Sequence, residues 1–82
     1  MAAVLTLYGK PGCHLCEEAR AAVEEARSGR AVDLVEVDIT LDPELHRRLG
    51  ERIPVLELDG EELFELFVDA AVLEQRLDRV PS

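Results

Sequence analysis

Two cysteines three residues apart, Cys13 and Cys16, are the side chains whose type and spacing most clearly permit chemistry. They are the only cysteines among 82 residues. A Cys-x-x-Cys pair can cycle between dithiol and disulfide, supply two thiolates to a metal, or stay an inert structural bridge. Which of these it does depends on the elements that hold the two sulfur atoms.

The pair lies where a loop connects a predicted strand to a predicted helix. The apolar, β-rich run 3–8 indicates a buried strand, and residues 9–12 indicate a loop. Residues at helical spacing then predict a helix that begins near Cys13 and stops at Gly29, with an inward side made of Leu15, Ala19, Ala22, Val23 and Ala26.

Cys13 at the first turn of a helix is favoured as a thiolate. Unpaired backbone N–H groups and the positive end of the helix dipole stabilise an anion there, and the thiolate is the nucleophile. The three-residue spacing also brings the two Cα atoms within disulfide range. We therefore expect Cys13 to attack and Cys16 to resolve.

The charges around Cys13 act in both directions. Lys10 in the loop and His14, when it is an imidazolium, favour the thiolate. Glu17 and Glu18 oppose it. Activation of Cys13 is therefore a hypothesis. It would lose its basis if the Cys13 thiol titrated with the pKa of an ordinary cysteine.

Two other uses of the pair have weaker support. A structural disulfide across so short a loop gains little from loop closure. A zinc site usually has four protein ligands, and the sequence holds no second Cys-x-x-Cys. His14 reaches such a site only with awkward geometry, and His46 lies on another predicted helix. We favour redox use and predict no metal site.

The rest of the chain predicts five further elements. Residues 32–38 indicate a strand, and Asp42-Pro43 opens a short helix that stops at Gly50. Two strand-like runs, 53–58 and 62–67, follow, and the last helix, capped by Asp69, covers residues 69–80. The order is β-α-β-α-β-β-α.

Connection rules turn this order into an α/β fold. The first βαβ unit should form a right-handed parallel crossover, whereas Asp59-Gly60 is typical of a tight hairpin turn. We expect a mixed four-stranded sheet with helices on both faces. The same turn sets Glu57 opposite Glu62, which is mildly unfavourable.

Composition limits the class of protein. The length fits one domain, 1–82, and the net charge of −9 argues against nucleic acid as a partner. No apolar run is long enough to cross a membrane, and residues 1–7 do not resemble a secretory signal. We expect a cytoplasmic monomer without membrane attachment.

The residues around the cysteines resemble a known family. The segment 8–16, in which Lys10-Pro11 leads into the Cys-x-x-Cys, resembles the opening of the glutaredoxins. Arg52-Ile53-Pro54 lies where they place Thr-Val-Pro, and Asp59-Gly60 matches their Asn-Gly turn. The resemblance covers nearly the whole chain and places it in the thioredoxin superfamily, among glutaredoxin-like proteins. It implies a thioredoxin-like, glutaredoxin-type sheet.

The resemblance also implies a substrate site. Pro54 would be a cis proline packed against the cysteines, which turns the backbone of Ile53 toward Cys13. An extended substrate would then pair its main chain with Ile53 and present its sulfur to the thiolate. The expected substrate-binding residues are Lys10, His14, Arg52, Ile53 and Pro54.

Departures from the family bear on the reductant. Phe64 and Glu65 stand where glutaredoxins have the Gly-Gly pair that admits glutathione, and they argue against glutathione and against glutathione-assisted iron–sulfur binding. Arg52 replaces the family threonine and could bind an anionic group. Leu7 lies where thioredoxins have a buried acid.

The sequence thus predicts a small thiol–disulfide oxidoreductase without a cofactor. Its substrate is a disulfide-containing protein or a small thiol, and its reductant is glutathione or a reductase, with a protein donor favoured. The alternative is a thioredoxin-fold binding or adaptor module without efficient turnover. Transient metal binding by the two thiolates is a third possibility.

Overall fold

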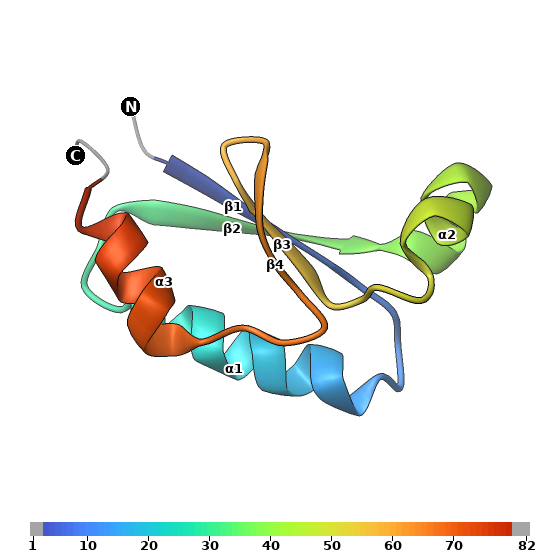
Figure 1. Cartoon of the computed structure of the whole chain (residues 1–82), viewed down its shortest axis with the longest axis horizontal. Coiled ribbons are helices and arrows are strands. Elements are labelled where there is room, and N and C mark those ends of the chain that lie inside the picture. Colours follow the sequence, from blue (N-terminus) through green and yellow to red (C-terminus); the bar gives the residue numbers. More distant parts are fainter. Residues whose placement is uncertain (1–2, 80–82) are drawn as a thin grey trace.

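The computed structural model describes residues 3–79. Its elements in chain order are β1 (Ala3–Gly9), α1 (His14–Arg27), β2 (Val32–Asp38), a 3₁₀ helix η1 (Ile39–Leu41), α2 (Pro43–Leu49), β3 (Val55–Leu58), β4 (Glu61–Glu65) and α3 (Ala70–Leu77). The strands form one four-stranded sheet in the order β2-β1-β3-β4 (Figure 1). β1 runs parallel to β2 and antiparallel to β3, and β3 is antiparallel to β4. The predicted element order and mixed, thioredoxin-like sheet are confirmed; η1 is an addition.

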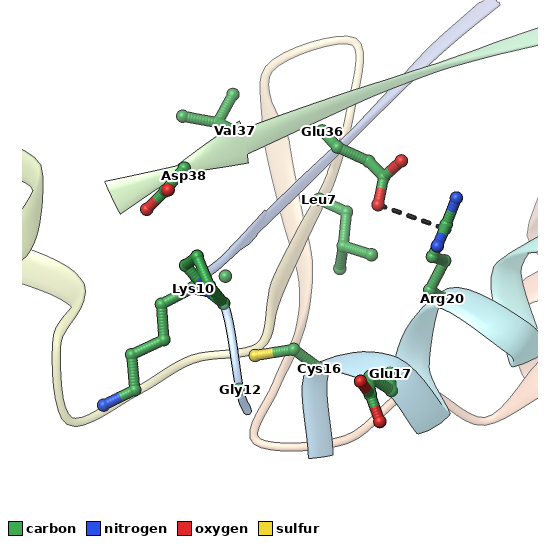
Figure 2. A pocket seen from close by; sticks show the side chains of 11 residues that line it. Leu7, Lys10, Gly12, Cys16, Glu17, Arg20, Glu36, Val37 and Asp38 are labelled. Carbon is green, nitrogen blue, oxygen red and sulfur yellow. Dashed lines mark ion pairs between the residues drawn. The ribbon is translucent and has the colours of Figure 1, made fainter. Parts of the chain in front are cut away.

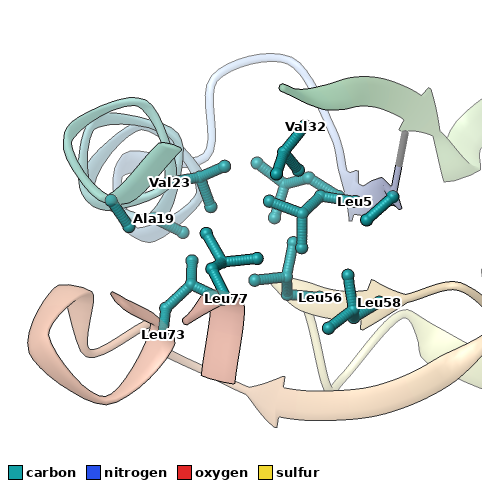
Figure 3. Close-up of a cluster of buried hydrophobic side chains, with 11 residues drawn as sticks. Leu5, Ala19, Val23, Val32, Leu56, Leu58, Leu73 and Leu77 are labelled. Carbon is teal, nitrogen blue, oxygen red and sulfur yellow. The ribbon is translucent and has the colours of Figure 1, made fainter. Parts of the chain in front are cut away.

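The main core lies between the sheet and the two longer helices. Leu5 on the central strand β1 pairs with Leu34 on β2 and Leu58 on β3, so their side chains share one face. α1 contributes Ala19 and Val23 to this face, and α3 contributes two leucines (Figure 3). Because all eleven buried members of this cluster are apolar, its burial is a main source of stability. The α3 leucines are Leu73 and Leu77.

The opposite face of the sheet is covered at one end only. Tyr8 and Val55 pair across β1 and β3, and they join Leu45 and Leu49 of α2 in a second cluster. Figure 1 shows α2 at this end of the sheet. Helices therefore lie on both faces, as expected, but much of the α2 side is open. Val35 on β2, for example, is 47% exposed.

Both predicted aspartate caps are present. Asp42 accepts hydrogen bonds from the backbone N–H groups of Glu44 at 2.9 Å and Leu45 at 3.3 Å. Asp69 accepts one from Val72 N–H at 3.1 Å. Each cap satisfies donors that the first helical turn leaves unpaired. The last helix was expected over 69–80, whereas α3 ends at Leu77; residue 80 lies outside the described residues.

The hairpin has the predicted turn and register. Asp59 and Gly60 both have positive φ, 49° and 89°, which is the geometry of a type I′ turn. Glu57 faces Glu62, as expected. The two carboxylates have separate partners, since Glu57 accepts from the Tyr8 hydroxyl and Glu62 pairs with Arg52.

The predicted end of the hairpin is wrong. β4 ends at Glu65 rather than at residue 67, because Leu66 takes a left-handed conformation with φ 72°. Leu66 and Phe67 are 49% and 63% exposed instead of lying on a core strand. The preceding strand also begins later than expected, at Val55, after Ile53.

The predicted inward side of the first helix is wrong at Leu15, which is 49% exposed. Successive residues of a helix differ by about 100° around the axis. Cys16 occupies the inward position at the start of α1, and Ala19 and Val23 continue that side. Four residues separate Leu15 from Ala19, a difference of about 40°, so Leu15 lies on the same side of α1 but in its first turn, where its side chain stays exposed.

None of the helices within residues 3–79 combines the length and the apolar character that crossing a membrane requires.

Candidate functional site

Cys13 is the N-cap of α1. Its φ and ψ are −90° and 110°, and its carbonyl accepts the first helical hydrogen bond, from Glu17 N–H at 3.1 Å. Its Sγ accepts a hydrogen bond from Cys16 N–H at 3.2 Å. The sulfur thus takes the position in which a capping oxygen usually sits, next to the positive end of the helix. A thiolate at Cys13 Sγ would be stabilised by the hydrogen bond from Cys16 N–H and by the positive end of the helix.

The two cysteines form a disulfide across the first turn of α1, with their Cα atoms 5.2 Å apart. They are not equivalent. Cys13 is half-buried, whereas Cys16 is 9% exposed and belongs to a buried cluster with Ile53 and Val55. An incoming reactant therefore meets Cys13 more readily than Cys16.

Gly9 permits the close approach of β1 to this disulfide. A Cβ at this position would lie 3.0 Å from Cys16 Sγ and 3.2 Å from Cys16 Cβ. Such contacts are shorter than side chains tolerate without shifting, so the position favours glycine. Sequence reasoning assigned Gly9 to a loop and missed this role. Its place between a strand and the Cys-x-x-Cys was the available signal.

The Ile53–Pro54 peptide bond is cis, as the family resemblance implied. Ile53 is buried in the cluster that contains Cys16 and against which Cys13 packs. The Ile53 N–H, however, already donates to Leu49 O at 3.1 Å. The carbonyl of Ile53 is therefore the backbone group that a substrate could pair with.

Leu66 anchors the end of β4 to this cis-proline turn, a role that no local sequence pattern predicted. Its N–H donates to Pro54 O at 2.8 Å and to Arg52 O at 3.1 Å. A leucine with positive φ is uncommon, since its Cβ crowds the backbone. Only the family comparison with glycine near this position could have suggested a turn here.

Arg52 is held by two glutamates of β4. Its guanidinium contacts Glu65 at 2.7 Å and also pairs with Glu62. The hydrogen bonds to Glu65 and Glu62 hold the pKa of Arg52 above its ordinary value. The expected anion-binding role of Arg52 therefore meets competition from two carboxylates of the same chain.

Lys10 and His14 are both exposed next to the disulfide. The His14 ring lies 3.8 Å from Glu18, one helical turn later, with 84% of its side chain accessible. Lys10 lines a pocket of about 370 Å³ between the end of β1, the first turns of α1 and the end of β2. Both side chains are therefore open to solvent beside the disulfide, where they could contact a substrate.

Cys16 reaches the same pocket. Figure 2 shows its sulfur directed toward the loop of Lys10 and Gly12, while Arg20 and Glu36 form an ion pair elsewhere on the wall. The pocket therefore gives solvent a route to the Cys16 sulfur. This matters because Leu7, where thioredoxins have an acid, lines it without offering a proton acceptor.

Near the site, the phenol of Tyr8 also has a shifted pKa. Its hydroxyl donates to Glu57 Oε1 at 3.2 Å. Burial and the negative charge of Glu57 raise the pKa of Tyr8, and the hydrogen bond adds to this, while Arg48 acts in the opposite direction. The phenol is therefore neutral at physiological pH and acts as a hydrogen-bond donor.

Within the part of the chain that the structure describes, no three His, Cys, Asp or Glu side chains gather in a way that could hold a metal ion. The site can therefore perform the chemistry of two sulfur atoms. Cys13 Sγ is the more accessible one, at the N-terminus of α1, and Cys16 Sγ is buried beside it.

These features together define a thioredoxin-fold domain with a Cys-x-x-Cys disulfide at the start of its first helix and a cis proline next to it. The sequence matches the family described as Glutaredoxin-like domain (DUF836) over residues 4–78. The chain belongs to this glutaredoxin-like family, as the sequence predicted.

Solved structures agree with this assignment. Protein XcR50 from X. campestris is 40% identical, with a TM-score of 0.76, and the match covers 94% of this chain and 99% of that chain. Protein Ne2328 from Nitrosomonas europaea is 31% identical, with a TM-score of 0.77 and coverage of 93% and 92%. A mutant thioredoxin from Halobacterium salinarum, 23% identical with a TM-score of 0.67 over 93% of this chain and 72% of that chain, shares the fold.

Proposed function

We propose that the protein is a thiol–disulfide oxidoreductase that cycles between the Cys13/Cys16 dithiol and its disulfide. The observation that carries the proposal is the hydrogen bond from Cys16 N–H to Cys13 Sγ at 3.2 Å, at the start of α1. This contact favours the charged, nucleophilic form of Cys13 in the reduced protein. A disulfide with only a packing role would not need its more accessible sulfur at that position.

The reaction has two exchange steps. The Cys13 thiolate attacks a substrate disulfide R–S–S–R′, the Cys13–S–S–R bond forms, and R′S⁻ leaves and takes up a proton. Cys16 then loses its proton to solvent in the adjoining pocket and attacks the Cys13 sulfur. The Cys13–Cys16 bond forms and RS⁻ leaves. Two electrons pass from the dithiol to the substrate, and an external thiol must return them.

The substrate contacts belong to the proposal as well. The carbonyl of Ile53, beside cis Pro54, would accept a hydrogen bond from the main chain of a bound substrate. Lys10 and His14 would meet the substrate from the solvent side. Arg52 would contribute only if a ligand displaced Glu62 or Glu65 from it. We propose a monomer that acts in the cytoplasm and receives electrons from a protein.

The pH dependence of thiol labelling tests the role of Cys13. In reduced Cys16→Ser, iodoacetamide should label Cys13 with a half-maximal rate at a lower pH than it labels Cys16 in Cys13→Ser. The difference follows from the position of Cys13 at the helix N-cap. Equal profiles for the two variants, at the pH of an ordinary thiol, would contradict the assignment of Cys13 as nucleophile.

A further inference from the structure

The middle of the α2 side of the sheet is open. Side chains alternate between the two faces along a strand, and Leu5 faces the main core. The opposite, α2 side therefore carries Val4 and Thr6 of β1 and, from the neighbouring strand β2, Val35 and Val37. We call these four residues the apolar strip. In Figure 1, α1 and α3 run along the other side of the sheet, and α2 lies at one end. Within residues 3–79, the middle of this face is thus without a helix over it.

An open face is unusual beside parallel strands, because helices normally cover both faces of a parallel pair. β1 and β2 are parallel, yet Val35 is 47% exposed, and Val4 and Val37 are only half-buried. A single exposed valine needs no explanation. The members of the apolar strip, however, are direct neighbours, since Thr6 pairs with Val35 across the two strands. The strip is therefore a continuous surface that the described part of the chain leaves uncovered.

Acidic side chains follow on the same face, on β3 and β4. Glu57 of β3 pairs with Thr6, and Glu62 of β4 pairs with Glu57. Glu65 of β4 pairs with the β3 residue two positions before Glu57, so it lies on this face as well. We call Glu57, Glu62 and Glu65 the acidic strip. Arg52 pairs with both Glu62 and Glu65, so one positive charge meets two negative ones and the strip stays negative.

The two strips divide the face into an apolar half and an acidic half. In the sheet order β2-β1-β3-β4, the apolar strip occupies the first two strands and the acidic strip the last two. A molecule that fits this face needs an apolar side and, next to it, positive groups. An amphipathic α-helix with basic residues along one flank has both, and helices are the elements that cover a sheet face beside parallel strands.

A second copy of this chain fits the face poorly. Each copy has 18 acidic and 9 basic residues, and pairing of the two open faces would bring two negatively charged surfaces together. Like charges that face each other across an interface disfavour association. The same net charge of −9 attracts a basic partner over a distance. Charge therefore favours a basic helix of another protein over self-association.

We propose that this face docks an amphipathic α-helix of a partner protein, whose apolar side lies on the apolar strip and whose Lys or Arg residues lie over the acidic strip. The docked helix supplies the layer that the parallel strands lack. Neither strip contains a cysteine, so the proposal goes beyond the oxidoreductase function and does not depend on it.

The test uses three synthetic peptides of about five helical turns each. The first has Leu along one side and Lys along the other. The second has the same residues in an order that spreads Leu around the helix, and the third is the first with Glu in place of Lys. Each peptide is titrated into the isotope-labelled, oxidised protein. Nuclear magnetic resonance then gives both the Kd and the backbone amides that respond.

Two variants change the face, and each has a control with the same change elsewhere. Val35→Glu places a carboxylate in the apolar strip, and its control is Val72→Glu, at a 45% exposed valine on α3. Glu57→Gln removes a charge from the acidic strip, and its control is Glu25→Gln, at an exposed residue of α1. Val35→Glu separates docking from general attraction, because an added negative charge by itself strengthens the binding of a Lys-rich peptide.

The amphipathic Lys peptide should bind most tightly, with the largest amide shifts on β1 and β2. Val35→Glu should weaken its binding about tenfold, whereas Val72→Glu should not weaken it. Glu57→Gln should weaken it about threefold more than Glu25→Gln does. The peptides with spread Leu or with Glu should bind at least about tenfold more weakly than the first peptide.

Four results would overturn the proposal. One is the absence of binding by the amphipathic Lys peptide. Another is equal binding by the peptide with spread Leu, with shifts over all elements, which would show general charge attraction only. The third is a Val35→Glu protein that binds as tightly as Val72→Glu. The last is a wild-type protein that dimerises in sedimentation, with Val35→Glu monomeric, which would make a second copy the occupant of this face.

Discussion

Cys13 and Cys16 differ in what surrounds each sulfur. Cys13 caps a helix and is half-buried, while Cys16 is packed so closely against Gly9 that a Cβ on that glycine would require Cys16 to shift. The pair is therefore asymmetric before any substrate arrives. Helix position favours a negative charge on one sulfur, and burial shields the other. These local surroundings support the proposed order, in which Cys13 attacks and Cys16 resolves.

Tyr8 predicts how stability responds to alkaline pH. Since burial and Glu57 raise its pKa in the folded state, the folded protein holds the phenolic proton more tightly than the unfolded chain does. The resulting stabilisation is fully present below about pH 10, the ordinary value, and is lost as pH rises through the folded pKa. Urea unfolding of the oxidised protein should show the free energy of unfolding falling over that range.

Tyr8→Phe is the control for this prediction, and Tyr8 is the only tyrosine in the chain, so its absorbance reports its own ionisation. The variant should show a smaller fall in stability above about pH 10. A wild-type phenol that ionises at its ordinary pKa, or identical alkaline slopes for both proteins, would contradict the assigned role of Glu57.

At the level of elements, the turn after β4 connects the hairpin to the disulfide. Leu66 donates to two carbonyls of the segment before β3, and Arg52 of that segment pairs with glutamates of β4. β4 and the cis-proline turn are thus joined by both backbone and side-chain contacts. Surface ion pairs contribute little by themselves, so the backbone contacts carry most of this connection.

Leu66→Gly and Leu66→Ala separate the backbone of this turn from its side chain. Both lose the leucine side chain, but alanine keeps a Cβ at φ 72°. Leu66→Gly should therefore be more stable than Leu66→Ala, by about 1 kcal/mol, in spite of the greater freedom of glycine in the unfolded chain. Urea denaturation of the two oxidised variants measures the difference. An alanine variant as stable as the glycine variant would show that the turn is not strained.

For the whole molecule, the sequence predicted what depends on local patterns. Short apolar, β-rich runs indicated the strands, Asp59-Gly60 indicated the hairpin, and Asp42 and Asp69 indicated two helix starts, because each of these signals acts over a few residues. The cysteine pair belongs to the same group: its position before a helical pattern was enough to predict that a helix begins near Cys13.

Features that depend on contacts between distant segments were not predictable. The exposure of Leu15 depends on what packs against the first turn of α1, which helical spacing alone does not predict. The turn at Leu66 depends on carbonyls of residues 52 and 54. The close approach of Gly9 to Cys16 requires both the strand and the helix to be in place. The sequence therefore located the reactive sulfurs, while the surface around them required the structure.

The most direct measurement of the central claim is turnover. The wild-type protein, an excess of dithiothreitol and a small disulfide substrate test whether Cys13 and Cys16 complete a catalytic cycle. Reduction of the substrate should be faster than with dithiothreitol alone. Cys13→Ser should abolish this acceleration. Reduced Cys16→Ser, freed of dithiothreitol before the substrate is added, should accumulate a substrate adduct on Cys13 that mass spectrometry detects. The account would be contradicted if the wild-type protein formed its disulfide but reduced the substrate no faster than Cys13→Ser does. That result would favour a binding module.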